Sequence, residues 1–359
     1  MKFVIRAGGV GTRLWPFSRQ SRPKQFHAMA GAQTMIQDAV RRLAPIAEAA
    51  DVHVSTGSGL VGLVREQLPE LEAHQLIVEP ALRNTGPAVG LECALLEARY
   101  PGCVIASLGS DHYIGKAAEF CRLLEVAEAA VGRYPDHLLT IGVKPVRPET
   151  GYGYIHKGGQ LEEINSEPVY TVGGFKEKPD LATAESYVGS GEYLWNSNMF
   201  VWKASTVLGL FERFEPEMYA GLRRIQEAVG TPEEERVIAE VYPTLDEVAV
   251  DNAIIEKAPK VATIEGDFDW GDIGSWAALT DVLAADENGN LFSGEVRAID
   301  ARDVTAYGPA GKLVALVGVE DLVVVDTEDA LLVCRKAEAQ RVKDVLALLK
   351  GEEGGGKYT

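Results

Sequence analysis

The strongest constraint on the fold is the alternation of short apolar runs with longer helical segments over the first 143 residues. The apolar runs have the length of strands and occur at residues 3–5, 51–55, 75–78, 103–108 and 137–143. Segments with helical spacing of apolar residues separate them, at about residues 35–48, 59–67, 88–99 and 117–131. Because parallel strands are usually joined by helical crossovers, this order predicts an α/β fold with a doubly wound, mostly parallel sheet.

The first apolar run leads into a loop that is rich in glycine and in positive charge. Gly8, Gly9 and Gly11 lie within four residues, and no acidic residue occurs before Asp38, although the formal net charge of the chain is -18. The basic residues of this stretch are Arg6, Arg13, Arg19, Arg22 and Lys24. Since backbone N–H groups of such a loop can bind phosphate oxygens, we expect a polyanionic ligand beyond the carboxyl end of the first strand.

Two common glycine loops are excluded by their spacing. A P-loop requires a Lys-Ser or Lys-Thr pair after its glycines, and none follows here. The dinucleotide-binding fingerprint, counted from Gly9, would require glycine at Leu14. The glycines taken alone also fit a purely structural turn.

The composition argues against two classes of binding partner and indicates the cellular compartment. The acidic balance argues against general nucleic-acid binding and against attraction to an anionic membrane surface. Cys93, Cys103, Cys121 and Cys334 have no metal-ligand spacing, which indicates reduced thiols and a cytoplasmic protein. No apolar run has the length of a signal-peptide core or a membrane span.

The pattern changes in the second half of the chain. From Thr150 onward, strands and loops indicate an insertion that walls one side of a cleft. After a polar break at residues 286–289, short β-rich runs and a closing helix at 337–349 follow. We therefore predict a domain at 1–286, a small β-rich domain with its closing helix at 287–350 and a disordered tail at 351–359, and we expect the β-rich part to serve assembly or stability.

Several motifs together resemble a known family. The glycine loop with T-R-L-W-P and R-P-K resembles the signature of the sugar-nucleotide pyrophosphorylases, and the form W-P-F-S-R resembles their mannose-1-phosphate guanylyltransferase branch. The resemblance implies a Rossmann-like nucleotide-diphospho-sugar transferase fold with a small left-handed β-helix-like domain. It also implies formation of GDP-mannose and pyrophosphate from GTP and mannose 1-phosphate with Mg²⁺.

The same resemblance implies roles for particular residues. Arg13, Lys24, Asp111 and Asp272 would be catalytic, with Mg²⁺ bound by Asp111 and Asp272 and with Asp269 as the competing ligand. The residues implied for the nucleotide are Gly8, Gly9, Gly11, Thr12, Arg13, Lys24, Glu79, Arg83, Asn84, Thr85 and Gly109. The residues implied for the sugar phosphate are Gly151, Glu177, Lys178 and Asn196.

Alternatives remain at several of these positions. The aspartates also fit turn or helix-cap roles, and R-N-T-G-P fits a helix cap as well as a contact with the nucleotide base. Arg6 and Val10 depart from the family pattern, which usually has an apolar residue and a small residue there. A glucose-, fucose- or heptose-1-phosphate nucleotidyltransferase and a non-catalytic sugar-nucleotide-binding regulator are the rival functions. A homodimer through the C-terminal domain is a further expectation.

Overall fold

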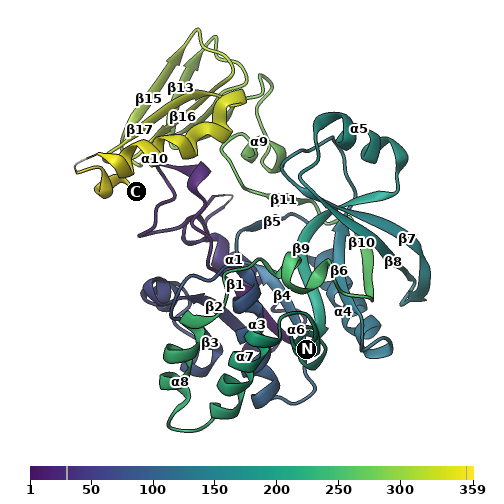
Figure 1. Ribbon diagram of the computed structural model, residues 1–359. Helices are drawn as coiled ribbons and strands as arrows, with labels where there is room; N and C mark the ends of the chain where they lie inside the picture. Colours follow the sequence, from purple (N-terminus) through teal and green to yellow (C-terminus); the bar gives the residue numbers. More distant parts are fainter. Residues whose placement is uncertain (30, 353) are drawn as a thin grey trace. The chain divides into compact units, whose positions relative to one another are not determined.

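The structure is a computed structural model that describes residues 1–29, 31–352 and 354–359 (Figure 1). The chain forms two compact units. The first unit contains Met1–Gly8, Ala39–Ser110 and Lys116–Phe268, and the second contains Gly9–Asp38, Asp111–Gly115 and Asp269–Thr359. The predicted boundary at 286/287 does not coincide with this division, since three earlier stretches belong to the unit that contains the C-terminal strands.

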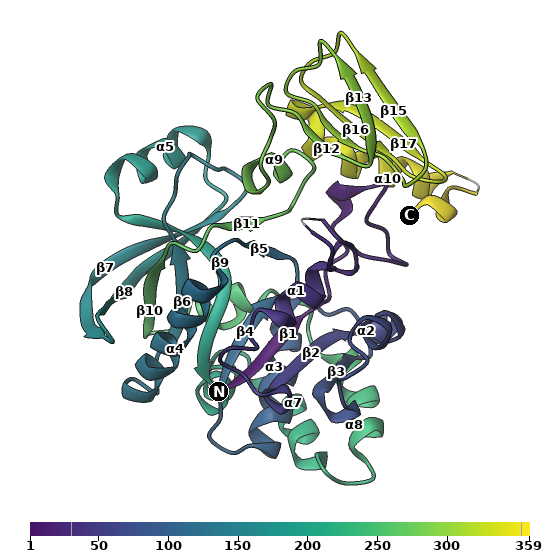
Figure 2. The ribbon, with the colours of Figure 1, turned by 180° about the vertical axis from the view of Figure 1, so that it is seen from behind.

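The first unit is built on a nine-stranded sheet with the order β3-β2-β1-β4-β9-β6-β10-β8-β7. The strands are β1 (Lys2–Arg6), β2 (Val52–Gly57), β3 (Leu76–Glu79), β4 (Val104–Gly109), β6 (Leu138–Val143), β7 (Gly153–Ile164), β8 (Glu167–Glu177), β9 (Tyr193–Lys203) and β10 (Val261–Gly266). Strands β1 to β4 pair in parallel and lie side by side (Figure 2). The predicted α/β class is confirmed, but the sheet is mixed, because β9 pairs antiparallel with both β4 and β6.

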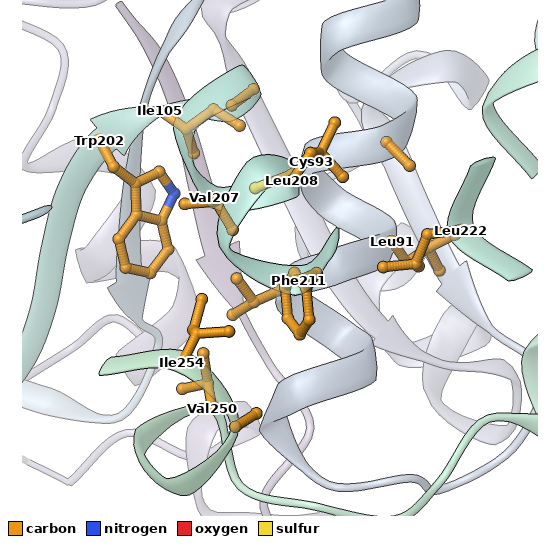
Figure 3. Close-up of a cluster of buried hydrophobic side chains, with 14 of the residues drawn as sticks. Leu91, Cys93, Ile105, Trp202, Val207, Leu208, Phe211, Leu222, Val250 and Ile254 are labelled. Carbon is orange, nitrogen blue, oxygen red and sulfur yellow. The ribbon is translucent and has the colours of Figure 1, made fainter. Parts of the chain in front are cut away.

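Helices connect and cover these strands. They are α1 (Met35–Arg41), α2 (Val61–Gln67), α3 (Thr85–Arg99), α4 (Ala117–Arg133), α5 (Leu181–Ser190), α6 (Ala204–Phe214), α7 (Pro216–Ala228) and α8 (Glu234–Val241). Helix α3 is buried continuously from Gly86 to Leu96, as expected for a helix with apolar residues on all sides. Figure 3 shows Leu91 of α3, Trp202 of β9 and Phe211 of α6 in the core that fixes this helix beneath the sheet.

The second unit contains a short ribbon and two small sheets. Strands β5 (His112–Ile114) and β11 (Trp270–Asp272) pair antiparallel. The C-terminal strands are β12 (Leu291–Ser293), β13 (Glu295–Ile299), β14 (Thr305–Tyr307), β15 (Leu313–Val317), β16 (Leu322–Asp326) and β17 (Leu331–Arg335). Successive strands alternate between the sheets β12-β14-β16-β17 and β13-β15, with parallel pairing up to β16. This winding is the predicted β-helix-like arrangement.

A single apolar core joins the start and the end of the second unit. Leu14 and Trp276 pack with Val323 of β16 and with Val342 and Leu346 of helix α10 (Val342–Gly351). The remaining short helix of this unit is α9 (Leu279–Val282). Segments far apart in the sequence are therefore held together by burial of apolar surface.

The chain end differs from the predicted disorder at 351–359. Helix α10 extends to Gly351, and residues Gly355–Tyr358 form a 3₁₀ turn. The indole Nε1 of Trp15 donates a hydrogen bond of 2.7 Å to the Tyr358 carbonyl, which ties this turn to the N-terminal loop. Glu353, which the same prediction covers, lies outside the described residues. No helix in the described ranges is long and apolar enough to cross a membrane.

Candidate active site

Two aspartates that are distant in the sequence meet at one lysine in the second unit. The Nζ atom of Lys24 lies 3.0 Å from Asp111 Oδ2 and 3.3 Å from Asp272 Oδ1. It also donates a hydrogen bond of 2.9 Å to the Ile273 carbonyl. Antiparallel pairing of β5 with β11 sets Asp272 opposite His112, so that Asp111 reaches the same ammonium group. We call Lys24, Asp111 and Asp272 the lysine cluster.

The positive charge of Lys24 and the negative charge of Asp111 stabilise each other. Burial by itself would lower the pKa of Lys24, which is 5% exposed, but attraction to Asp111 and Asp272 outweighs burial and raises that pKa. Burial would raise the pKa of Asp111, but the positive charges of Lys24 and His112 hold it below its usual range. At neutral pH the cluster therefore holds an ammonium group at Lys24 beside the ionised carboxylate of Asp111.

The glycine loop is shaped around the lysine side chain. Gly11 has φ +66°, and a Cβ atom added there would lie 2.9 Å from Lys24 Cδ. Glycine at this position therefore satisfies both a left-handed conformation and a close approach. Val10 accepts a hydrogen bond from the Ser18 hydroxyl through its carbonyl, so the departure at Val10 leaves the loop backbone tethered. Gly8 and Gly9 are exposed.

Arg13 is also held within the second unit, by residues that the sequence reading missed. Its Nη1 donates a hydrogen bond of 2.9 Å to Gln340 Oε1. A Cβ atom on Gly274 would lie 3.1 Å from Arg13 Nη2 and 3.2 Å from Asp272 Oδ2, so that glycine leaves room for both groups. No sequence spacing links Gln340 to Arg13, whereas Gly274 follows Asp272 by only two residues along the chain.

The other positions of the loop have simpler roles. Thr12 is exposed and begins a 3₁₀ turn, Thr12–Leu14. Arg19 donates a hydrogen bond through Nη1 to Asp329 Oδ2 at 2.8 Å. Asp269, the competing metal ligand, is exposed and lies at the start of β11, where its carbonyl accepts from the Gly115 N–H. The His112 ring packs edge-on against Trp270.

In the first unit, the residues implied for the nucleotide lie at the carboxyl ends of β3 and β4 and at the start of α3. Glu79 is buried and accepts a hydrogen bond of 2.6 Å from the Tyr242 hydroxyl, and burial raises its pKa. Asn84, with φ +65°, caps α3 by accepting from the Thr85 N–H at 2.8 Å. The hydroxyl of Thr85 accepts from the Val250 N–H at 2.9 Å. The cap interpretation of R-N-T-G-P is thus observed.

Two further nucleotide candidates have clear positions. Arg83 donates a hydrogen bond to the Pro243 carbonyl. Gly109 ends β4 directly opposite Arg6 of β1. The chain runs from β1 to β2 and β3 on one side of β1, and β4 then lies on the other side of β1. The ends of β1 and β4, at Arg6 and Gly109, therefore mark the topological switch point of the sheet, where ligands of doubly wound folds bind.

Most of the sugar-phosphate candidates also come together in the first unit. Glu177 ends β8 opposite Gly153 of β7. A Cβ atom on Gly153 would lie 2.7 Å from Glu177 Oε2 and 3.5 Å from Asn196 Cβ, so both side chains lie beside Gly153 and its lack of a side chain leaves room for them. Lys178 Nζ donates to Glu177 Oε1 at 2.6 Å. We call Gly153, Glu177 and Asn196 the sugar-side group.

Gly151, the other glycine candidate for the sugar phosphate, lies before β7. Its N–H donates a hydrogen bond of 2.9 Å to Glu149 Oε1, and Gly153 is the glycine between Glu177 and Asn196. The motif T-G-Y-G-Y-I contains both glycines, and only strand pairing decides which one faces the carboxylate.

The fold is that of a nucleotidyltransferase. Residues 2–289 match the family model described as Nucleotidyl transferase, and residues 294–349 match the MannoseP isomerase/GMP-like beta-helix domain. The chain belongs to the nucleotidyl transferase family. The predicted resemblance and fold class are confirmed.

Particular relatives specify the branch. XanB, a xanthan biosynthesis protein of Xanthomonas campestris pv. campestris (strain B100), is 38% identical over 97% of this chain and 73% of its own length. A mannose-1-phosphate guanylyltransferase of Klebsiella pneumoniae is also 38% identical, with the same coverage of each chain. A crystal structure named mannose-1-phosphate geranyltransferase from Thermus thermophilus matches with a TM-score of 0.87 and 31% identity, over 97% of this chain and 99% of that one.

Proposed function

We propose that the chain transfers the guanylyl group of GTP to mannose 1-phosphate and forms GDP-mannose and pyrophosphate. The relatives named mannose-1-phosphate guanylyltransferase support this substrate pair. The observation that carries the proposal is the lysine cluster, because it joins a buried cation and two acids beside the basic glycine loop. That combination suits a reaction between anions.

The chemistry requires charge stabilisation more than proton transfer. An oxygen of the sugar phosphate attacks the α-phosphorus of GTP, a new P–O bond forms, and the bond to the β-phosphate bridging oxygen breaks as pyrophosphate leaves. The nucleophile is already an anion near neutral pH, so no general base is needed. Two unit charges about 4 Å apart interact by roughly 4 kcal/mol at an effective dielectric near 20. Fixed cations at Arg13 and Lys24 therefore offset the repulsion between the reactants.

The carboxylates of the lysine cluster fit a magnesium ion. Mg²⁺ prefers one or two carboxylates and leaves its other positions to phosphate oxygens and water. Asp111 and Asp272 are the proposed ligands, because both carboxylates lie at the same ammonium group. Across residues 1–29, 31–352 and 354–359, no group of three or more His, Cys, Asp or Glu side chains is arranged to hold a metal. A bound Mg²⁺ would supply charge neutralisation at the α-phosphate. Lys24 holds the two carboxylates on one side of the loop.

The test is a pyrophosphate-release assay over a grid of nucleoside triphosphates and sugar 1-phosphates with Mg²⁺. We expect release with GTP and mannose 1-phosphate at a rate well above every other pair. Preferred turnover of a glucose, fucose or heptose 1-phosphate would replace the sugar assignment. Binding of GDP-mannose without turnover of any pair would identify a sugar-nucleotide-binding regulator.

We also propose a cytoplasmic homodimer that associates through the β13–β15 sheet, without a nucleic-acid or membrane partner. Ile299, Leu313 and Val317 of this sheet are 63%, 58% and 65% exposed, which is unusual for large apolar side chains on neighbouring strands. The four cysteines are free thiols, as expected in a reducing compartment. Light scattering of Val317→Asp should give the monomer mass where the unaltered chain gives twice that mass. A monomer for both would refute the interface.

A further inference from the structure

Arg6 is a charged residue at the end of a strand whose other residues are largely buried. It closes β1 and pairs in register with Ser55 of β2 and Gly109 of β4. Its Nη2 donates a hydrogen bond of 3.1 Å to the carbonyl of Asn198 in β9, and its Nε is buried with no hydrogen-bond partner among the residues described. Burying part of a guanidinium costs free energy. Interactions with neighbouring groups must therefore offset this cost at Arg6.

Three acidic side chains, Glu79, Glu92 and Asp251, interact electrostatically with Arg6. Glu92 of α3 is 1% exposed, accepts from the Ser107 hydroxyl at 3.2 Å and has an Oε1 without a partner in the part of the chain that is described. Burial raises the pKa of Glu92 to about 7, and Arg6 opposes that rise. Burial likewise raises the pKa values of Glu79 and Asp251, and Arg6 again opposes. Arg6 is therefore a counter-charge for three acids.

The hydrogen bond of Arg6 leads directly to the sugar-side group. Asn198 has φ +55° and lies where the pairing of β9 with β6 is irregular. Its N–H donates to Asn196 Oδ1 at 3.0 Å, and Asn196 Nδ2 donates back to Asn198 Oδ1 at 3.1 Å. Asn198 is thus hydrogen-bonded through its carbonyl to Arg6 and through its side chain to Asn196. Burial raises the pKa of Asp251, the charge of Arg6 lowers it and the charge of Glu177 raises it, so Asp251 interacts electrostatically with both residues.

We propose that Arg6 is a positioning residue for the sugar phosphate. Its guanidinium holds the Asn198 carbonyl, and the paired amides of Asn196 and Asn198 transmit that restraint to the sugar-side group. This inference rests on the proposed function, because it takes the sugar-side group to bind mannose 1-phosphate. Arg6 itself touches no reacting atom in this account. Arg6 also acts as a counter-charge for Glu92, so its effect on stability and its contact with Asn198 can be tested separately.

The test compares Arg6→Met, Glu92→Gln and the double variant Arg6→Met/Glu92→Gln. Each is measured for thermal stability and for KM of mannose 1-phosphate and of GTP in the pyrophosphate-release assay. Arg6→Met should lower stability and raise KM for mannose 1-phosphate about tenfold, with KM for GTP changed less than about twofold. Glu92→Gln leaves the Asn198 contact intact and should keep both KM values. The double variant should recover stability, because the buried carboxylate is gone, but should keep the raised KM.

Each outcome decides the inference. If the double variant recovers both stability and KM, Arg6 serves only as a counter-charge and the positioning role is overturned. The same follows if Arg6→Met raises both KM values equally or leaves the KM for mannose 1-phosphate unchanged. If Arg6→Met does not fold, the double variant supplies the comparison. Failure of the unaltered chain to release pyrophosphate would instead refute the proposed function, and it is measured first.

Discussion

At the scale of single residues, the lysine cluster shows how distant positions become one site. Lys24 is nearly buried and touches the carboxylates of Asp111 and Asp272, which raise its pKa above the ordinary value. The residue types were readable from the sequence, since short motifs surround each of them. Their meeting was predicted only through the family resemblance, because the β5–β11 pairing has no local signal. Gln340 and Gly153 were missed for the same reason.

The proposed metal site predicts a large difference between two neighbouring acids. Asp111→Asn should lower kcat at least about a hundredfold, because it removes one carboxylate from the lysine cluster. Asp269→Asn, which changes an exposed acid close to β11, should leave kcat within about threefold. Steady-state pyrophosphate release at saturating Mg²⁺ measures both variants. A large loss of kcat in Asp269→Asn, with a near-normal kcat in Asp111→Asn, would assign the metal to Asp269 in place of Asp111.

Glu92 predicts a particular dependence of stability on pH. Burial raises its pKa in the folded chain from the ordinary 4.5 to about 7, so the unfolded state ionises first as the pH rises. The contribution of Glu92 to stability is therefore present below pH 4.5 and is lost progressively up to about pH 7. Urea unfolding at pH 5 and pH 7.5 should show a smaller loss of stability for Glu92→Gln than for the unaltered chain. An identical loss in both proteins would refute this.

At the scale of elements, strand and helix runs were predicted far better than strand partners. The early strands and α3 follow from short apolar runs and an apolar helix with Asn84 at its cap. The antiparallel insertion of β9 between β4 and β6 was not predicted, since pairing between distant segments depends on the whole sheet. The closing helix at 337–349 is in fact a 3₁₀ segment, Lys336–Arg341, followed by α10. That break places Gln340 where it can bond Arg13.

This 3₁₀ segment predicts an effect of the C-terminal part on nucleotide use. Gln340→Ala removes the hydrogen bond to Arg13 and should raise KM for GTP about threefold to tenfold, with a smaller effect on mannose 1-phosphate. Gln160→Ala makes the same chemical change at an exposed position of β7 and serves as the matched control. Steady-state kinetics with each substrate varied in turn measures both. Equal KM values for GTP in the two variants would show that Gln340 does not act through Arg13.

At the scale of the whole molecule, the chain folds back on its own beginning within the second unit. Leu14 and Trp276 share one core with β16 and α10, and Arg19 and Asp329 add an ion pair between the same regions. The polar break at residues 286–289 predicts a domain boundary near residue 286. The compact units cross that line, because packing depends on which apolar faces meet and not on order along the chain.

This shared core predicts unequal costs for two leucines of α10. Leu346 is 8% exposed in the core, whereas Leu348 is 68% exposed on the same helix. Leu346→Ala should lower the free energy of unfolding by about 2 to 4 kcal/mol, and Leu348→Ala should change it by less than about 0.5 kcal/mol. Chemical denaturation of both variants measures the difference. Equal costs would mean that α10 does not pack on the N-terminal loop as described.

The neighbourhood of Arg6 and Glu92 has a consequence for inheritance. The Glu92 carboxylate without the guanidinium would be a buried charge that lacks this counter-charge, whereas the guanidinium without Glu92 keeps Glu79 and Asp251 as counter-charges. Natural relatives that carry an acid at position 92 should therefore carry a cation at position 6, and the acid without that cation should be rare. When segments of related chains are recombined in the laboratory, hybrids that separate position 6 from position 92 should be recovered less often than hybrids that inherit both from one parent.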